Sequence, residues 1–332
     1  MAPTLVAVDE TGQRIIAELQ ANGRASWTEI AEREGISVAA VARRGQQLLA
    51  SGAIRIGVLP RHSILQDQGG LSDIRIVCAP GKQFEVAEAL IDVPNLRFLA
   101  LVTGKYDLIG ELSSRIDGGA HVRQIQAIQG IPGVERCVSN PHMHAYKWSQ
   151  RWLRQTLGDH LPEPAPEREP CDGAHIDDVD RQIIDAMAND GRISLRAVAE
   201  RLSLNESTVR RRFEILTNCG CLEVITLVSA HAVGYEAETL LDVFVEPKML
   251  GQVADQLSTF DGVRYIAASL SSPALFCEVI LPDAGKLHSF LTEDLAWMDG
   301  VRSWEAGTEL LTFKRGFLET PWWRRAAGRE ID

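Results

Sequence analysis

The sequence has no long apolar stretch, because nowhere in its 332 residues do 18 consecutive apolar residues occur. A transmembrane helix is therefore not expected. The N-terminal stretch of eight residues is uncharged and too short to be a signal peptide, so no signal peptide is expected either. Basic residues are in deficit, with 34 Lys and Arg against 45 Asp and Glu. The net charge of −11 argues against a broadly basic surface, so any contact with DNA must come from locally placed positive charge.

Cysteine is scarce and scattered, with six residues in the whole chain. Cys219 and Cys221 are two apart but have no partner pair nearby in the sequence, so neither a zinc site nor a disulfide framework is expected. The chain also lacks a P-loop, a dinucleotide-binding glycine fingerprint, an H-E-x-x-H motif and a G-x-S-x-G elbow. We expect no cofactor and no metal, in a reduced, cytoplasmic protein without a membrane partner.

A few other residues have side chains suited to ligand binding. His142 and His144 are two apart on one face of a predicted strand and could ligate a metal. Because the sequence places no third ligand, we interpret both as structural histidines. Residues 148–157 have the composition of a short amphipathic helix, and its tryptophans are interpreted as packing residues.

The same two-part pattern occurs twice in the chain. Residues 8–54 align with residues 176–222 without a gap at an offset of 168, with 14 identities in 47 positions, and the match continues at an offset of 167. A period of this length is far longer than a solenoid unit of a few tens of residues. The chain is therefore a duplicated two-domain unit, which suggests a two-fold symmetric target or an interface between the copies. Residues identical in both copies include Asp9/Asp177, Gly23/Gly191, Arg24/Arg192, Arg43/Arg211, Arg44/Arg212, Arg97/Arg264 and Glu111/Glu278.

Each copy opens with three short helical patterns. In the first copy, Ser26 begins a capping-box pattern and Ser37 is suited to cap the third helix. In the second copy, Asn205 occupies the corresponding cap position. Two helices joined by a tight turn and packed on a first helix form a helix-turn-helix. The apolar stretches that follow, at 54–59 and 222–228, predict short strands.

A mixed module follows each helix-turn-helix, and its apolar patterns predict the order β-α-β-β-α-β, the ferredoxin-like arrangement. The predicted fold class is α+β, with two winged-type helix-turn-helix domains alternating with two ferredoxin-like βαββαβ effector domains. Prolines and alternating charges mark a stiff, solvated linker between the copies. We expect helix-turn-helix domains at 5–60 and 176–230, effector domains at 70–157 and 238–325, and the linker at 158–175.

With this order of elements, the chain resembles the Lrp/AsnC (feast/famine) transcriptional regulators in a tandem-duplicated form. Thr103–Asp107 resembles their effector-domain turn, and Gly130–Val134 resembles the segment before their last strand. Each of the two copies has this resemblance, and together they make up nearly the whole chain. A typical member of the family has one copy. The resemblance implies RAM-type effector modules that bind small molecules, often amino acids, where the modules associate. The helix-turn-helix residues that carry it are Asp9, Ile15-Ile16, Gly23-Arg24, Ile30-Ala31, Ser37, Arg44 and Gly52-Ala53-Ile54.

The last helix of the second helix-turn-helix is the better candidate for contacting DNA bases. We call the last helix of each helix-turn-helix its reader. The N-terminal part of this helix meets base edges while neighbouring groups hold phosphates. Ser207 and Thr208 are short donors and acceptors, and arginine binds guanine bidentately or holds a phosphate. Successive residues point about 100° apart on a helix, so we place Arg210 or Arg211 toward DNA and Arg212 nearer the core. The alternative is that some of these arginines only form intrachain salt bridges.

The corresponding helix of the first copy has small apolar residues where bases should be read. Such residues touch a thymine methyl group but make no hydrogen bond to a base. Gly45 replaces Phe213 and costs about 1 kcal/mol of helix propensity. We therefore expect the first reader to be the weaker one, and to position the chain by phosphate contacts. The reading positions are Val38, Ala39, Ala40 and Ala42, and the phosphate contacts are expected from Arg24, Arg43 or Arg44, with Ser37 as a further DNA contact.

The turn Thr103-Gly104-Lys105-Tyr106-Asp107 is the candidate effector site. It supplies a hydroxyl group, open backbone amides and both signs of charge, a set that could hold an ammonium and a carboxylate. The alternative is a plain hairpin turn in which Gly104 serves the backbone and Asp107 caps it. The second module has Leu270–Ala274 there and lacks the glycine, lysine, tyrosine and aspartate. We therefore expect ligand sites at half the number of effector modules.

The resemblance implies a sequence-specific DNA-binding transcriptional regulator, not an enzyme, that responds to a small-molecule effector. Its expected partners are double-stranded DNA, with half-sites about one helical turn (~34 Å) or a multiple apart, the effector, and further copies of the chain in a homodimer or homotetramer. Effector binding would change how the modules associate, and hence the spacing of the readers.

Two other interpretations remain open. Siroheme decarboxylases are similar to this family in fold, and some are fused pairs, so a tandem chain fits them as well. They would need histidines and arginines in the effector modules, and where they would place a His-Asn-Tyr type segment this chain has Thr103–Asp107. The third interpretation is an effector-binding protein whose DNA readers have decayed, which suits the first copy better than the second.

Overall fold

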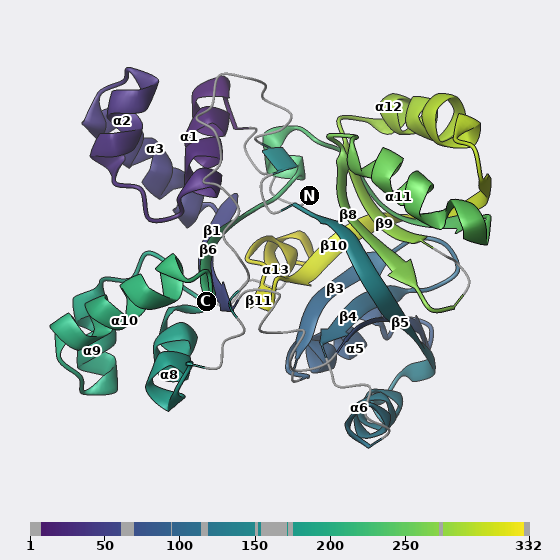
Figure 1. Ribbon diagram of the computed structural model, residues 1–332, viewed down its shortest axis with the longest axis horizontal. Coiled ribbons are helices and arrows are strands. Elements are labelled where there is room, and N and C mark those ends of the chain that lie inside the picture. The colour runs from purple at the N-terminus through teal and green to yellow at the C-terminus, as the bar shows by residue number, and fades with distance from the viewer. Residues whose placement is uncertain are drawn as a thin grey trace. The chain divides into compact units, whose positions relative to one another are not determined.

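The computed structural model describes residues 8–60, 70–93, 95–113, 119–149, 152–153, 171, 175–271 and 275–328 (Figure 1). Its contacts divide the chain into two compact units. The helix-turn-helix unit comprises the described residues of 8–68 and 157–229, and the sheet unit those of 69–156 and 230–332. Each unit takes one part from each repeat, so equivalent parts of the two copies pack together.

The helix-turn-helix unit contains the expected three helices and a strand from each copy. The first copy folds as α1 (Glu10–Ala21), α2 (Trp27–Glu34), α3 (Val38–Ala50) and β1 (Ile54–Pro60). The second folds as α8 (Asp178–Met187), α9 (Leu195–Leu202), α10 (Glu206–Asn218) and β6 (Leu222–Val228). Ser26 forms the expected capping box with Glu29, and the Ser37 hydroxyl accepts from the backbone amide of Ala40. Asn205 stands at the predicted cap position of α10 without a side-chain cap bond.

The strand after each helix-turn-helix pairs with its counterpart from the other copy. β1 and β6 form an antiparallel two-stranded sheet, visible side by side in Figure 1, with Gly57 opposite Ile225 at the centre of the register. Because these two residues are 168 apart, the local two-fold axis of the duplication passes between them. Ile54, Ile56 and Leu227 are buried, so the strands are held by apolar packing as well as by backbone hydrogen bonds.

The sheet unit confirms the predicted β-α-β-β-α-β order in both modules. The first has β2 (Leu71–Cys78), α5 (Gln83–Ile91), β3 (Leu96–Val102), β4 (Leu108–Ser113), α6 (Ala120–Gln129) and β5 (Val134–Trp148). The second has β7 (Ala237–Val245), α11 (Leu250–Ser258), β8 (Val263–Ser269), β9 (Leu275–Leu281), α12 (Ala284–Ser289) and β10 (Val301–Arg315). Short turns of 3-10 helix (His231–Val233, Pro247–Met249 and Leu295–Trp297) and π-helix (Phe290–Asp294) belong to the second module, and β11 (Leu318–Glu319) and α13 (Trp322–Ala326) follow it.

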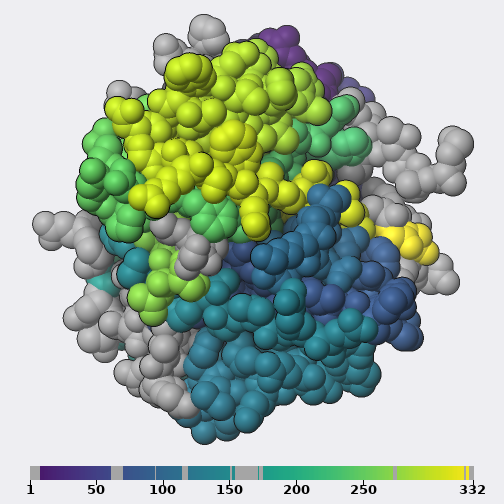
Figure 2. Space-filling model, turned by 90° about the vertical axis from the view of Figure 1, so that its right-hand side faces the viewer, coloured from purple at the N-terminus to yellow at the C-terminus, as the bar shows by residue number. Residues whose placement is uncertain are grey.

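The two modules share their long strands. β5 pairs with β2 through its first half and with β8 through its second half, and β10 pairs in the same way with β7 and then β3. The pairings therefore close into a cycle, β10-β3-β4-β2-β5-β8-β9-β7-β10. Figure 2 shows the modules of this unit, blue to teal and green to yellow, in direct contact. Trp148, which we expected in a helix, is the last residue of β5, because strand pairing with Tyr265 extends that far.

The shorter strands of the sheet unit, β2–β4 and β7–β9, are buried on both faces. In β2, Ile74 and Ile76 pack with the α5 residues Val86 and Leu90, and an equivalent apolar cluster lies under α11 in the second module. Alternate residues of a strand point to opposite faces, so the neighbouring Asp73 and Arg75 face the other way and are also buried. The face that is not covered by helices therefore has a mixed apolar and charged composition.

Candidate functional site

Recognition helix α10 exposes most of the residues predicted to contact DNA. Ser207, Arg210 and Arg211 are exposed, and Thr208 is half-buried. Arg210 pairs with Glu206 at 2.7 Å, one turn earlier on the same helix. Arg211 makes no ion pair with the described part of the chain, so its guanidinium is available for a phosphate or a base.

Recognition helix α3 presents a different surface. Val38 is 44% exposed and Arg43 is exposed, and Arg43 has no ion-pair partner within the described ranges. Arg44 instead lies 2.8 Å from Asp9, the N-cap of α1. Its counterpart Arg212 contacts Asp177, the N-cap of α8, in the same way. Arg44 therefore ties the recognition helix to the first helix, and its predicted DNA contact stays a prediction.

Arg24, which we expected at a phosphate, instead joins the two helix-turn-helix domains. Its Nη1 donates to the carbonyl oxygens of Gly191 and Ile193, at 2.6 and 3.0 Å. The equivalent Arg192 donates from Nη1 and Nη2 to the carbonyl oxygens of Gly23 and Ala25, at 2.8 and 3.0 Å. These hydrogen bonds are reciprocal, because they join equivalent positions at the 168-residue offset. The arginine of each copy thus provides hydrogen-bond donors to backbone carbonyl groups of the other copy. The two readers are thus fixed relative to each other within this unit.

Gly45 has a packing role that the propensity argument missed. A Cβ atom at this position would lie 2.4 Å from the ring of Trp27. In the second copy, Leu195 replaces Trp27 and Phe213 replaces Gly45. The aromatic side chain is therefore on the second helix of the motif in the first copy and on the third helix in the second copy. Each aromatic ring also packs against an arginine of the other copy. The Cζ atom of Arg192 lies 4.2 Å from the ring centroid of Trp27, and the Cζ atom of Arg24 lies 5.2 Å from the ring centroid of Phe213.

In the sheet unit, the predicted effector turn joins β3 to β4. Gly104 has a φ of +103°, which glycine adopts readily. The carboxylate of Asp107 accepts hydrogen bonds from the Cys78 amide at 2.8 Å and from Gln83 Nε2 at 3.2 Å. The Thr103 hydroxyl oxygen accepts from the Thr308 amide at 2.9 Å. Asp107 therefore joins the turn to the end of β2 and the start of α5, and Thr103 joins it to β10.

Beside this turn lies a cavity of about 310 Å³. This is the lower end of the range of roughly 300–1,000 Å³ for small-molecule pockets. Thr103, Lys105 and Tyr106 line one side, and Glu305 of β10 lies 4.0 Å from the Lys105 ammonium. The cavity thus has apolar walls with both signs of charge at its mouth and on its floor. The remaining lining residues are Arg75, Val102, Ile109, Leu240, Asp242, Phe276, Ala306 and Gly307.

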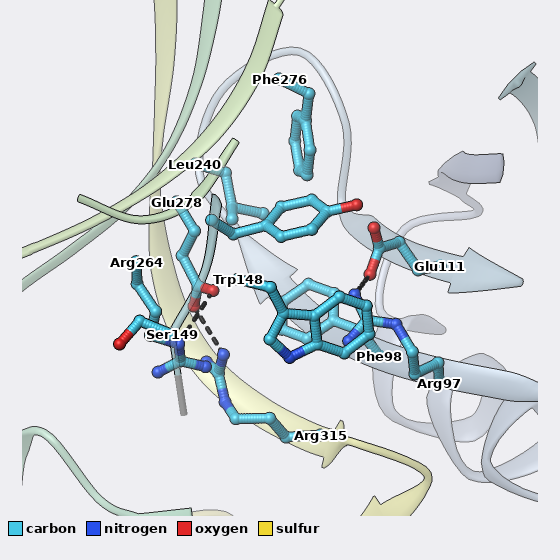
Figure 3. Close-up of a pocket in the computed structure, with 11 residues that line it drawn as sticks. Arg97, Phe98, Glu111, Trp148, Ser149, Leu240, Arg264, Phe276, Glu278 and Arg315 are labelled. Atoms are coloured by element: carbon cyan, nitrogen blue, oxygen red, sulfur yellow. Dashed lines mark hydrogen bonds and ion pairs between the residues drawn. The ribbon is translucent and has the colours of Figure 1, made fainter. Parts of the chain in front are cut away.

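A second, smaller cavity of about 30 Å³ lies in a buried charged layer between the modules (Figure 3). Arg97 pairs with Glu111, and the equivalent Arg264 lies 3.2 Å from Glu278, which also accepts from Arg315 at 2.6 Å. Figure 3 shows these two groups on either side of Trp148, whose ring centroid lies 3.9 Å from the Arg97 Cζ. Since one water needs roughly 10–15 Å³, this cavity has room for two or three waters and for no larger ligand.

His142 belongs to the same charged layer and not to a histidine pair. Its Nε2 lies 3.1 Å from Asp73 Oδ1, and its Nδ1 lies 3.1 Å from the Tyr265 hydroxyl. His144 is exposed and packs edge-on against Tyr146. A register shift between His142 and His144 separates them, so the predicted shared face is wrong. A structural role for His142 is consistent with these contacts.

The charged layer holds more acid than base. Burial raises the pKa of Glu278 to about 7, and burial also raises the pKa of Glu309. Burial opposes ionisation of Asp73, but the hydrogen bond from His142 and the charge of Arg75 lower its pKa. Protons on some carboxyl groups thus offset the excess of acid. The buried groups are the carboxyls of Asp73, Glu111, Asp242, Glu278 and Glu309 and the guanidiniums of Arg75, Arg97, Arg264 and Arg315.

This buried charged layer was not predicted, although the sequence contains one signal of it. Arg97/Arg264 and Glu111/Glu278 are identical charged pairs at the repeat offset, on strands whose other residues are apolar. In each copy, one buried strand has the arginine and the next buried strand has the glutamate. This arrangement indicates that both copies form the same ion pair. The role of His142 had no such signal, because its counterpart in the second copy is Glu309.

The fold and these surfaces define a class: a tandem helix-turn-helix protein with a fused pair of ferredoxin-like modules. The model of the AsnC-type helix-turn-helix domain matches residues 8–49 and again 176–217. An uncharacterized HTH-type transcriptional regulator of Pyrococcus horikoshii is 31% identical over 138 residues, which cover 41% of this chain and 86% of that protein. The regulator LrpA of the same organism is 27% identical over 127 residues, covering 38% and 90%. The chain belongs to the Lrp/AsnC family of helix-turn-helix transcriptional regulators.

A solved structure covers nearly the whole of the tandem chain. The siroheme decarboxylase NirDL covers 95% of both chains, with a TM-score of 0.58 and 13% sequence identity. At this identity the match shows the fold alone, including the fusion of two copies. Among the described residues, no helix is both long enough and apolar enough to cross a membrane.

Proposed function

We propose that this protein is a sequence-specific DNA-binding transcriptional regulator whose two readers act as a covalent pair and whose sheet unit binds a small metabolite. The observation that carries the proposal is the reciprocal contact of Arg24 and Arg192 beside the β1–β6 sheet. This contact fixes two exposed recognition helices about a local two-fold axis, which suits two DNA half-sites. The family's named regulators support the same function.

The two readers have different tasks in this proposal. Ser207, Thr208 and Arg211 of α10 read bases or adjacent phosphates, since they are accessible and polar. α3 supplies Arg43 and the Ser37 end of the helix, which hold the backbone without distinguishing bases. The expected operator is therefore bipartite, with one half-site of stronger sequence preference.

Genome-wide mapping of the DNA bound by the full chain tests the class. A recovered motif with one well-defined and one degenerate half would support the proposal. Failure to enrich any motif, together with no binding to duplex DNA in vitro, would contradict it.

Single substitutions test the division of labour between the readers. Arg211→Ala should lower the preference for the mapped operator over a scrambled duplex by about 5- to 150-fold, the range of one base contact at ~1–3 kcal/mol. Arg43→Ala should weaken both duplexes about equally and reduce the salt dependence. Fluorescence anisotropy gives both values, and Arg302→Ala, at an exposed arginine of the sheet unit, is the control. An equal loss of discrimination in the Arg43 and Arg211 variants would refute the assignment.

The proposed effector site is the cavity beside Thr103, Lys105 and Tyr106. Its size and its paired charges suit an amino acid or a related small metabolite, with the ligand carboxylate near Lys105 and its ammonium near Glu305 or Asp242. Because the cavity is bounded by both modules, binding there can change how they pack. We propose an amino-acid-type effector, action on DNA in the cytoplasm, and a dimer or tetramer of chains, which light scattering would measure.

A siroheme decarboxylase-like enzyme is the second candidate. The full-length fold match to NirDL and the arginines and His142 of the sheet unit favour it. Against it, these arginines are already paired with carboxylates, and the larger cavity is small for a tetrapyrrole. Adding siroheme and recording the visible absorption spectrum separates the two functions. A shifted spectrum followed by product formation would favour the enzyme.

A further inference from the structure

Four side chains with metal-binding atoms meet in the second helix-turn-helix domain. Cys171 and His175 precede α8, Cys219 directly follows α10, and Cys221 directly precedes β6. One ligand atom from each residue lies within 4.8 Å of those of the other three. The expectation that Cys219 and Cys221 have no partner pair is therefore wrong. Their partners are Cys171 and His175, which the sequence separates from them by three helices.

Two distances from one imidazole nitrogen of this cluster are those of a tetrahedral metal site. His175 Nδ1 lies 3.5 Å from Cys171 Sγ, and His175 Nε2 lies 3.5 Å from Cys219 Sγ and 3.8 Å from Cys221 Sγ. With Zn–S bonds of about 2.3 Å and Zn–N bonds of about 2.0–2.1 Å, a tetrahedron has ligand atoms roughly 3.5–3.8 Å apart. His175 Nε2 and the thiols of Cys219 and Cys221 are thus spaced as ligands of one ion, and the Cys171 thiol lies within 4.8 Å of the same group.

The ligand set selects among metals. Three thiols and one imidazole are soft or borderline donors, which favour zinc and disfavour magnesium and calcium. Four protein ligands leave no open position, which is the pattern of a structural and not a catalytic zinc site. We propose that this chain binds one zinc ion through Cys171, His175, Cys219 and Cys221. Binding requires three thiolates, so it releases up to three protons and leaves a site of net charge −1.

Only the second copy has this cluster. At the offset of 168, Ser51 and Ala53 stand where Cys219 and Cys221 do, and Pro3 and Ala7 stand where Cys171 and His175 do. The proposal is therefore one ion per chain. It does not depend on the proposed function, because the geometry of the four side chains carries it.

The zinc ion would have a defined structural effect. Cys219 is the C-cap of α10, and His175 stands two residues before Asp177, the N-cap of α8. The ion would tie the end of the recognition helix to the start of the same domain. This tie lies beside the apolar cluster of Ile183, Leu216 and Leu222, which Cys171 and Cys219 border. Zinc would thus stabilise the domain with the more polar reading helix.

Metal analysis of the tag-free, full-length protein, purified under reducing conditions, tests the proposal. We expect about one zinc per chain by inductively coupled plasma mass spectrometry. Cys219→Ser and Cys221→Ser should each lower the content at least about tenfold, whereas Cys137→Ser, in β5 of the sheet unit, should retain it. Replacing zinc with Co²⁺ should give the visible absorption of tetrahedral thiolate-bound cobalt, which the first two variants lose.

Other outcomes would overturn the site. Zinc content near zero with no cobalt spectrum in wild-type protein would do so, as would equal zinc content in wild type and both cysteine variants. A mass 2 Da below that of the reduced chain, in protein that takes up no metal, would assign the cysteines to a disulfide instead. If circular dichroism shows that the cysteine variants do not fold, the wild-type cobalt titration and the variant His175→Ala, at an exposed position, decide.

Discussion

At the scale of the residue, the two copies differ by complementary exchanges. Trp27 with Gly45 and Leu195 with Phe213 fill equivalent spaces with the bulk on opposite helices. Similarly, position 142 carries a histidine and its equivalent 309 a glutamate, both in contact with buried partners. In such pairs, each copy fills the equivalent space with a different set of neighbouring residues.

The Trp27–Gly45 pair predicts a double-mutant cycle. Gly45→Phe should destabilise the helix-turn-helix unit by about 1–3 kcal/mol, because the new ring would overlap Trp27. Adding Trp27→Leu, which copies the second domain, should recover most of the loss. Urea unfolding monitored by circular dichroism measures both. Additive losses in the double variant would show that the two positions are not coupled.

Glu278 predicts a pH dependence of stability in the sheet unit. Burial raises its pKa from 4.5 to about 7 in the folded state, so the folded protein holds a proton that the unfolded chain releases. This stabilisation is complete below about pH 4.5 and is lost as the pH rises to about 7. Glu278→Gln should therefore flatten the decrease of the melting temperature across this window in differential scanning calorimetry. The exposed Glu293→Gln should leave the slope unchanged, and a wild-type slope in Glu278→Gln would contradict the assignment.

At the scale of the element, the helices and the order of helices and strands along the chain could be predicted from the sequence, because the signals for them are local. Capping residues, apolar spacing and glycine stops lie within one element, and they predicted α1–α3, α8–α10 and the order of both modules. The partners of β1, β5 and β10 in the other copy lie more than 100 positions away in the sequence, as in β1 with β6. No local pattern encodes that choice, nor the extension of β5 and β10 into the other module. The metal-ligand cluster was missed for the same reason.

The reciprocal arginines predict a matched pair of losses in the helix-turn-helix unit. Arg24→Ala and Arg192→Ala each remove two hydrogen bonds from a guanidinium to carbonyl oxygens. Each should lower the free energy of unfolding by about 1.5–3 kcal/mol, the range for bonds to charged groups. Hydrogen exchange of the β1 and β6 amides would show faster opening in both variants. Arg14→Ala, at a surface arginine that pairs with Glu34, is the control, and an equal effect there would contradict the prediction.

At the scale of the whole molecule, the duplication has become asymmetric. The second copy has the polar reading helix and the cysteine cluster, whereas the first has the Thr103–Asp107 turn. The polar reading positions, the cysteine cluster and the effector turn each have no equivalent set of residues in the other copy. The repeat preserves the framework, and the differences between copies mark the candidate sites.

This asymmetry predicts the number of effector molecules bound. Lys105 and Tyr106 line the larger cavity, whereas the second copy has Ser272 and Pro273 at the aligned positions. Screening the twenty amino acids by thermal shift and titrating any hit by calorimetry should give one site per chain. Tyr106→Ala should weaken binding at least about tenfold, with Tyr146→Ala as a tyrosine control outside the cavity. Two equivalent sites per chain would contradict the prediction.

The β1–β6 sheet also affects how the regulator behaves in a cell. A regulator made of two separate chains dissociates when it is scarce and exchanges subunits with related regulators. Here the two partners are parts of one polypeptide and are joined within one folded unit. Their pairing is therefore independent of protein abundance. A few copies per cell would suffice for complete readers.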